Sequence, residues 1–297
     1  MRGPGRADGR LDGAAALAHP ARFPSPARPA MRTLVVQSYR TRDVAAWIAQ
    51  CLASVRDWAA RRGFAYDFVD DRFFDYAPPW VRERCARQLL PLTDVARLYL
   101  LRERLDAGYE RVIWVDADVL VFAPEAFTLA GVHGYSLCRE VWLRVGADGA
   151  AQIEEKVNNA VIVADRGHPF LDFWRFATEE ILRAHAAEDI GPLSGSTVPL
   201  TELARLMPVR VLPQVGLFSP PLVREAAAGG GPLLRAWAQH FGQPIAAVNL
   251  CASLQDRSAG GDSVGAAELE GAVRQLLHTR GAVVNAALQP APRYAWG

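Results

Sequence analysis

The feature that most constrains this chain is an apolar stretch, Tyr109 to Phe122, that two aspartates interrupt. Val112 to Val115 and Val119 to Phe122 are continuous apolar runs, as expected for strands buried on both faces. Asp116 and Asp118 lie between these runs, and a carboxylate is costly to remove from water without a partner. Because residues two apart in a strand point to the same side, both carboxylates can reach one point. We therefore expect a divalent cation there, and hard oxygen ligands favour Mn²⁺ or Mg²⁺.

Length and charge limit the class of protein. The chain has 297 residues, of which 51% are hydrophobic, enough for one large domain or two small ones. A formal net charge of +1 creates no strong positive electrostatic field that would attract a polyanion, so we expect no nucleic-acid partner. No apolar run approaches the roughly 20 residues of a membrane span, which leaves only peripheral contact with a membrane.

Cysteine usage and the N-terminal residues bear on the compartment. The four cysteines are scattered through apolar segments, without metal-ligand spacing, and are typical of buried, reduced thiols. The N-terminus has arginines but no apolar core of a signal peptide. Both observations favour a cytoplasmic protein. Abundant Ala, Arg and Gly are typical of a GC-rich bacterial source.

Composition also predicts the domain boundaries. Residues 1–30 are mostly Gly, Pro, Ala and Arg and cannot bury enough surface to order themselves, so we expect a disordered N-terminal segment. Residues 31–255 form the predicted domain, and residues 256–297 the predicted C-terminal helix with a loose tail.

Strand-like and helix-like patterns alternate along the chain. Apolar residues repeat at helical spacing over Asp43–Arg62, with Asp43 expected near the helix start, and Thr93 is the expected N-cap of a helix over Thr93–Ala107. We expect a loop over Phe73–Arg87 and a polar excursion over Arg139–Gly149. The predicted strands include Thr33–Ser38, Ala65–Val69, Tyr135–Cys138 and Ala160–Ala164. The alternation predicts the α/β class, with a mostly parallel central sheet flanked by helices.

Five residues at element ends are candidates for substrate binding. Ser38, Tyr39 and Arg40 end the first strand, where open α/β sheets bind ligands, although an ordinary connecting loop fits equally well. Asp94 and Arg97 share one helix face. The planar Arg97 fork suits a phosphate or a sugar, and the alternative is a surface ion pair.

Two amides and a loop complete the candidate set. Asn158 and Asn159 precede a strand, and amides can bind sugar hydroxyls without adding charge; the alternative is a pair of turn-capping residues. The loop that contains Gly191 and Pro192 is rich in Gly and Ser, so its backbone N–H groups could meet a diphosphate. It is not a P-loop.

Several segments together resemble the GT-A glycosyltransferases that use nucleotide sugars. The match is to the DxD motif of the DXD sugar-binding and glycogenin-like families, and it spans residues 33–250. Two departures stand out: Ala160 replaces a usual glycine, and Val248-Asn249-Leu250 lies where a late metal-ligating His is expected. The segments that carry the resemblance are Asp116–Asp118, Thr93–Leu98, Val157–Val161, Gly191-Pro192 with Leu200-Thr201, and Val211–Pro213 with Phe218–Pro220.

The resemblance implies a fold, a reaction and a set of roles. It implies a GT-A (Rossmann-like) fold and transfer of a hexose-like sugar, with retention, from a UDP- or GDP-sugar to a glycan or lipid-linked acceptor, as in bacterial polysaccharide biosynthesis. Asp116 and Asp118 would hold Mn²⁺ or Mg²⁺ and, with Asn158 and Asn159, act in catalysis. The bound substrate would meet Ser38, Tyr39, Arg40, Asp94, Arg97, Gly191 and Pro192.

Three alternatives stay open. A haloacid-dehalogenase-like phosphohydrolase also has a strand that ends in DxD, but it needs a later acidic loop that Gly260-Gly261-Asp262 imitates poorly. A catalytically inactive sugar-nucleotide-binding protein is the second. The third concerns the metal alone, because Asp70-Asp71 is a rival acidic pair. Acids placed near the sugar by chain order are Glu154, Glu155 and Asp189.

Overall fold

The computed structural model describes residues 31–255 and 263–288. The expectations for residues 1–30, for Gly260-Gly261-Asp262 and for the last nine residues therefore lie outside the described residues.

A six-stranded mixed sheet forms the centre of residues 31–288, in the order β2-β1-β3-β6-β5-β7. Three of its five strand pairs are parallel, and β6 runs antiparallel to both of its neighbours, β3 and β5. This confirms the predicted α/β class with a mostly parallel sheet. The strands are β1 (Thr33–Ser38), β2 (Ala65–Val69), β3 (Arg111–Val115), β5 (Tyr135–Val145), β6 (Ala151–Asp165) and β7 (Val211–Leu212).

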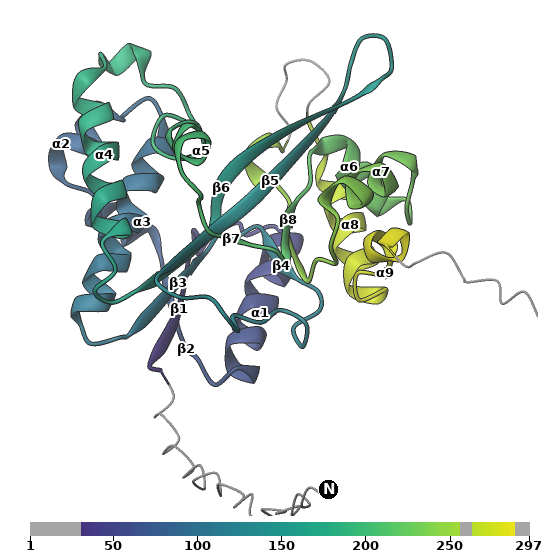
Figure 1. The fold of residues 1–297 in the computed structure, drawn as a ribbon, viewed down its shortest axis with the longest axis horizontal. Helices are drawn as coiled ribbons and strands as arrows, with labels where there is room; N and C mark the ends of the chain where they lie inside the picture. Colours follow the sequence, from purple (N-terminus) through teal and green to yellow (C-terminus); the bar gives the residue numbers. More distant parts are fainter. Residues whose placement is uncertain (1–30, 256–262, 289–297) are drawn as a thin grey trace, which may run out of the picture. The chain divides into compact units, whose positions relative to one another are not determined.

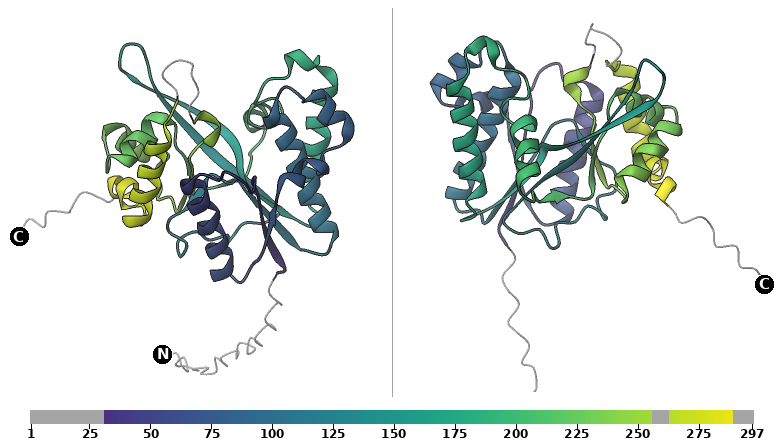
Figure 2. Two further views of the ribbon diagram at one scale, coloured as in Figure 1. Left: turned by 180° about the vertical axis from the view of Figure 1, so that it is seen from behind. Right: turned by 45° about the horizontal axis from the view of Figure 1, so that its top comes forward.

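Helices cover both faces of this sheet (Figures 1 and 2). Leu34 and Val36 of β1 face the core formed with α3 and α4, whereas Val35 faces the core formed with α1. Burial on both faces explains the continuous apolar runs in the sequence. The helices on the first face are α2 (Pro79–Arg84), α3 (Leu89–Asp106), α4 (Phe170–Ala184) and α5 (Thr197–Leu206), and α1 (Ala46–Arg61) lies on the second.

A three-stranded sheet in the order β4-β9-β8 continues from the central one. Its strands are β4 (Val119–Val121), β9 (Ala247–Asn249) and β8 (Val215–Leu217). Antiparallel pairing sets Val119 opposite Asn249. A late segment of the chain is therefore brought beside the residue that follows Asp118.

The C-terminal helix belongs to the core of the second sheet. Leu269, Val273 and Leu276 of α8 are fully buried in one cluster with Phe218 and Trp237. Helices α6 (Pro220–Ala227), α7 (Pro232–Phe241), α8 (Ala266–His278) and α9 (Ala282–Asn285) lie together on this side (Figure 1). Within residues 31–255 and 263–288, no helix combines the length and the apolar character that a membrane crossing requires.

Several element boundaries differ from the predictions. Asp43 has a positive φ of 51° and α1 begins at Ala46, so Asp43 does not cap that helix. Thr93 lies inside α3, where its Oγ1 donates to the Leu89 carbonyl at 2.9 Å, instead of at the N-cap. A hydroxyl can bond its own helix backbone as readily as it caps one, which explains this error.

The segment predicted as a loop over Phe73–Arg87 is largely helical. It contains the 3₁₀-helix η1 (Asp71–Tyr76) and α2. Asp70 caps η1 by accepting the Arg72 N–H at 3.0 Å. The three other 3₁₀-helices of the described residues are η2 (Ala187–Asp189), η3 (Ala252–Leu254) and η4 (Ala286–Leu288).

Strands β5 and β6 are much longer than predicted and form a hairpin that extends beyond the rest of the sheet (Figure 1). The expected polar excursion over Arg139–Gly149 is the outer part of β5 and its turn. Polar side chains are tolerated in these strands because the outer part of the hairpin is exposed.

Candidate functional site

The two aspartates lie where the central sheet gives way to the smaller one. Asp116 follows the last residue of β3, and its N–H donates to the Ala160 carbonyl of β6 at 2.8 Å. The Asp118 carbonyl accepts the Leu250 N–H at 3.1 Å, just before β4 begins. The backbone of both aspartates is thus fixed by neighbouring strands.

Asp116 is held by two donors from within the core. Its Oδ1 accepts the Trp114 Nε1–H at 2.7 Å and lies 3.2 Å from the Arg97 guanidinium. Its side chain remains 24% exposed. The pKa of Asp116 is raised to about 7, mainly by burial, with Arg97 acting to lower it and Asp118 to raise it. The ionised carboxylate is therefore incompletely compensated by the protein.

Arg97 positions these groups from a buried location. Its side chain is only 5% exposed, lies over the Trp114 ring at 5.1 Å, and donates to the Asn159 carbonyl at 3.0 Å. Asp94 lies 3.8 Å from Arg97 and accepts the Asn159 Nδ2–H at 2.8 Å. Three predicted site residues, Asp94, Arg97 and Asn159, therefore contact one another around Asp116. Because these three side chains are buried, they are better suited to positioning Asp116 than to contacting substrate directly.

Asp118 is held from the late segment of the chain. Its Oδ1 accepts the Asn249 Nδ2–H at 3.0 Å and its Oδ2 accepts the Ala252 N–H at 2.7 Å. Burial raises the pKa of Asp118, and the Ala252 N–H lowers it. Asn249 thus lies beside the second aspartate, in the segment where the resemblance leads one to look for a histidine.

A buried glutamate that the sequence analysis missed lies next to the predicted Asn158. The Asn158 Nδ2–H donates to Glu140 Oε2 at 3.0 Å, and Asn158 Oδ1 accepts the Ala160 N–H at 2.6 Å. Glu140 is 6% exposed, and burial raises its pKa. Asp118, Glu140 and Asp116 all raise the pKa of the Cys251 thiol, below the larger effect of burial. The three carboxylates therefore lie close enough to that thiol to act on it electrostatically.

The end of β1 reaches the site through a residue that was not predicted. The Gln37 Nε2–H donates to the Asp116 carbonyl at 3.2 Å, and Gln37 is fully buried. Ser38 is the next residue, at the carboxyl end of β1. The Arg40 guanidinium lies over the Tyr39 ring at 5.5 Å. The predicted segment is thus adjacent to Asp116, with Arg40 exposed.

Among the described residues, the predicted glycine-proline pair makes no hydrogen bond with the aspartates, but its loop does reach the site. The Gly191 N–H is bound by Ser194 Oγ at 3.0 Å. Gly195 instead packs on Asp94, and a Cβ atom there would lie 3.0 Å from Asp94 Oδ2. A close approach of this kind is a reason for glycine at that position.

The remaining predicted acids lie in other surroundings. Glu155 pairs with Arg139 and His240, Glu154 pairs with Lys156, and Asp189 is exposed in η2. In the rival acidic pair, Asp70 is likewise engaged by another residue, since it accepts hydrogen bonds from the Arg72 side chain and N–H.

The donor set at the aspartates fits a divalent cation. Both side chains offer hard oxygen ligands, and Mg²⁺ characteristically takes one or two carboxylates together with substrate phosphates and water. Within residues 31–255 and 263–288, no group of three or more His, Cys, Asp or Glu side chains is arranged to hold a metal by itself. A cation at Asp116 and Asp118 would therefore need ligands from its substrate or from water.

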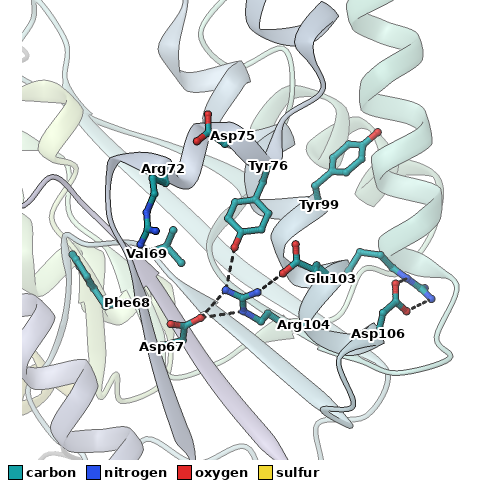
Figure 3. A pocket seen from close by; sticks show the side chains of 11 residues that line it. Asp67, Phe68, Val69, Arg72, Asp75, Tyr76, Tyr99, Glu103, Arg104 and Asp106 are labelled. Atoms are coloured by element: carbon teal, nitrogen blue, oxygen red, sulfur yellow. Dashed lines mark hydrogen bonds and ion pairs between the residues drawn. The ribbon is translucent and has the colours of Figure 1, made fainter.

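A cavity of about 740 Å³ lies elsewhere, between β2, η1 and α3 (Figure 3). It contains none of the predicted site residues. Arg104 is bound there by Asp67, Glu103 and Tyr76. The two other arginines that line it, Arg72 and Arg102, are also in ion pairs, so among the described residues the cavity has no unpaired arginine for an anionic substrate. We place the candidate site at the aspartates instead.

No family model matches the chain, and no characterised protein matches it in sequence. Solved structures that it resembles include a glycosyltransferase involved in glycosylation of the major capsid of PBCV-1, with 12% identity, a TM-score of 0.43, and coverage of 74% of this chain and 93% of that one. Mouse xyloside xylosyltransferase 1 has 9% identity and a TM-score of 0.37, over 76% and 99% of the two chains. The glycosyltransferase GlyE of Streptococcus pneumoniae has 12% identity and a TM-score of 0.36, over 86% and 62%. These likenesses are too distant to assign a family.

Proposed function

We propose that this protein is a glycosyltransferase that moves a sugar from a nucleoside-diphosphate sugar to an acceptor. The observation that carries the proposal is the incompletely compensated pair Asp116 and Asp118 at the end of β3, with Arg97 as their buried cation. A divalent cation with a diphosphate would complete this arrangement of charges.

The site residues have separate roles in the proposed sugar transfer. A nucleotide sugar reacts when its diphosphate leaves, and a divalent ion bound by Asp116 and Asp118 would supply Lewis-acid stabilisation of that leaving group. Arg97, Trp114 and Asn249 keep the two carboxylates in place. Ser38 and Arg40 lie where a nucleoside would enter at the sheet edge.

In this proposal, Asn158 and Glu140 contact the transferred sugar. The half-exposed Asn158 side chain can bind a hydroxyl group without adding charge beside a developing oxocarbenium ion. Glu140 offers a carboxylate to the same region. The finer assignments are a UDP- or GDP-sugar donor, Mn²⁺ or Mg²⁺, retention of configuration, and a glycan or lipid-linked acceptor made on the cytoplasmic side of a bacterial membrane.

A ligand screen by thermal denaturation tests this proposal. We expect Mn²⁺ together with UDP or GDP to raise the melting temperature by several degrees, because a ligand that binds only the folded state stabilises it. Neither the metal nor the nucleotide alone should give the full shift. If no nucleoside diphosphate stabilises the protein in the presence of Mn²⁺, the proposed function is wrong.

The two asparagines should respond differently to substitution. Asn158→Ala should weaken binding of the intact nucleotide sugar more than binding of the free nucleoside diphosphate, because only the sugar meets this amide. Asn159→Ala removes the amide donor to buried Asp94, which costs roughly 1–3 kcal/mol of stability, and should weaken the binding of both ligands alike. Calorimetric titration of each variant with both ligands measures the difference. Equal losses in Asn158→Ala would indicate a structural role.

A further inference from the structure

Trp142 differs from the other tryptophans of the described residues. The six others all pack in a core cluster: Trp47, Trp58, Trp80, Trp114, Trp174 and Trp237. Trp142 lies outside these clusters and is partly exposed. Within residues 31–255 and 263–288, its Nε1–H has no hydrogen-bond partner and its ring stacks on no other aromatic ring, as is also true of the buried Trp47, so partial exposure outside the core is what sets Trp142 apart. A strand tryptophan that is left partly exposed calls for an explanation, since burying the whole ring normally stabilises the protein strongly.

The register of the hairpin puts Trp142 on the same face as Glu140. Side chains two apart in a strand share a face, so Glu140, Trp142 and Arg144 follow one another on β5. On the opposite face, Val141 and Leu143 are fully buried against the α6–α7 side. Trp142 is therefore the aromatic side chain on the open face of the hairpin, about 7 Å further out than Glu140.

Hydrogen bonds connect this face to the aspartates. The Asp116 N–H donates to the Ala160 carbonyl, the Ala160 N–H to Asn158 Oδ1, and the Asn158 amide to Glu140. One further step along β5 leads to Trp142. The hairpin that carries it extends outward from the central sheet (Figures 1 and 2). Trp142 thus lies two residues along β5 from Glu140, which is hydrogen-bonded to Asn158 of the candidate site.

The charges around Trp142 are balanced. Glu154 lies opposite Trp142 in the register, and Lys156 lies opposite Glu140. Lys156 contacts Glu154 at 3.0 Å and Arg144 approaches it to 3.9 Å. Two acids, Glu140 and Glu154, therefore match two bases, Arg144 and Lys156. A face of this kind provides hydrogen-bonding groups around an aromatic plane without a net field, which suits a neutral sugar and disfavours a polyanion.

We propose that the Trp142 face is the acceptor subsite and that it binds a neutral oligosaccharide, with one sugar ring packed on the Trp142 indole. The apolar C–H face of a pyranose covers the ring, and the flanking carboxylates and cations bind its hydroxyls. The identification of the bound oligosaccharide as an acceptor rests on the proposed function. The carbohydrate site itself rests on the hairpin alone.

Binding to an array of neutral and acidic oligosaccharides tests the proposal, with the full chain in the presence of Mn²⁺ and UDP or GDP. The parent should bind neutral oligosaccharides. Trp142→Ala should weaken that binding about tenfold or more, equivalent to about 1.4 kcal/mol, and Trp142→Phe should retain most of it. Val145→Ala is the matched control, because Val145 is 45% exposed on the other face of the same hairpin. It should bind as the parent does.

The outcomes separate this inference from the proposed function. Binding only to acidic glycans, no binding to any glycan, or equal binding by Trp142→Ala would each overturn the subsite. The thermal shift with Mn²⁺ and nucleotide reports on the aspartates and should be unchanged in all three hairpin variants. If that shift is present and glycan binding is absent, only the acceptor subsite fails. If glycan binding depends on Trp142 while no nucleotide binds, the proposed function fails and a carbohydrate site remains.

Discussion

Asp118→Asn should abolish metal-dependent sugar transfer and remove the thermal stabilisation that Mn²⁺ with a nucleoside diphosphate gives the parent. The substitution keeps the shape of the side chain but removes the charge of one of the two proposed carboxylate ligands. The ligand-free protein should be unchanged or slightly more stable at neutral pH. Burial raises the pKa of Asp118, so removing its charge relieves a cost, which offsets the hydrogen bond lost from Asn249 or Ala252.

Asp70→Asn provides the matched control, because Asp70 belongs to the rival acidic pair and lies in an exposed cap. It should keep both the transfer activity and the stabilisation. If Asp118→Asn keeps the full shift while Asp70→Asn loses it, the metal binds at the rival pair. Labelling of Asp116 by beryllofluoride would instead support the phosphohydrolase, because that mechanism uses the first aspartate as nucleophile.

Arg97→Met should be the most destabilising of the substitutions considered, lowering the melting temperature by on the order of 10 °C. Arg97 is 5% exposed and is the cation nearest to both Asp94 and Asp116 among the described residues. Removing one partner of a buried ion pair costs roughly 3–5 kcal/mol, since the remaining charge stays buried. Each kcal/mol corresponds to about 2–4 °C in a chain of this size. Thermal denaturation of the ligand-free protein measures the loss.

The loss should depend on pH in a defined direction. Arg97 lowers the pKa values of Asp94 and Asp116, which burial raises, so its removal raises both further. A folded-state pKa above the unfolded value of about 4 means that stability falls as pH rises through that window. The deficit of Arg97→Met should therefore be larger at pH 8 than at pH 5, where the carboxylates can take up protons.

Arg102→Met is the control for this prediction. Arg102 lies in the same helix and pairs with Asp106 and Asp172, but its side chain is 36% exposed. Exposed ion pairs contribute roughly 0–1 kcal/mol, so its effect should be small and nearly independent of pH. Equal losses in the two variants would show that Arg97 stabilises α3 by packing alone.

Part of the site could be predicted because it follows from local pattern. Two aspartates in a doubly buried apolar run indicated a strand end with an unmet need for charge, and the structure places them at the end of β3. Asp94 and Arg97, three residues apart on a helix, were expected to share a face, and both lie near Asp116. In each case the spacing within one element determines the geometry.

Other parts depended on contacts between distant segments. Asn249 reaches Asp118 across 131 positions through the pairing of β4 with β9, and no local pattern signals that register. Glu140 lies in the segment predicted as a polar excursion. Its burial could not be predicted from the sequence, because it depends on how β5 and β6 pair. The boundaries at Asp43 and Thr93 failed because capping residues have several backbone partners to choose from.

The sequence by itself determined the α/β class and the central buried strand, and it predicted a cation at the pair of carboxylates, because these rest on periodicity and on the cost of burying charge. Only the tertiary structure decided what surrounds that pair. It put Arg97 in the core and Gln37 against the Asp116 backbone, and it left Trp142 partly exposed on a long hairpin. Those positions depend on strand register and helix packing across the whole chain, which composition and spacing do not encode.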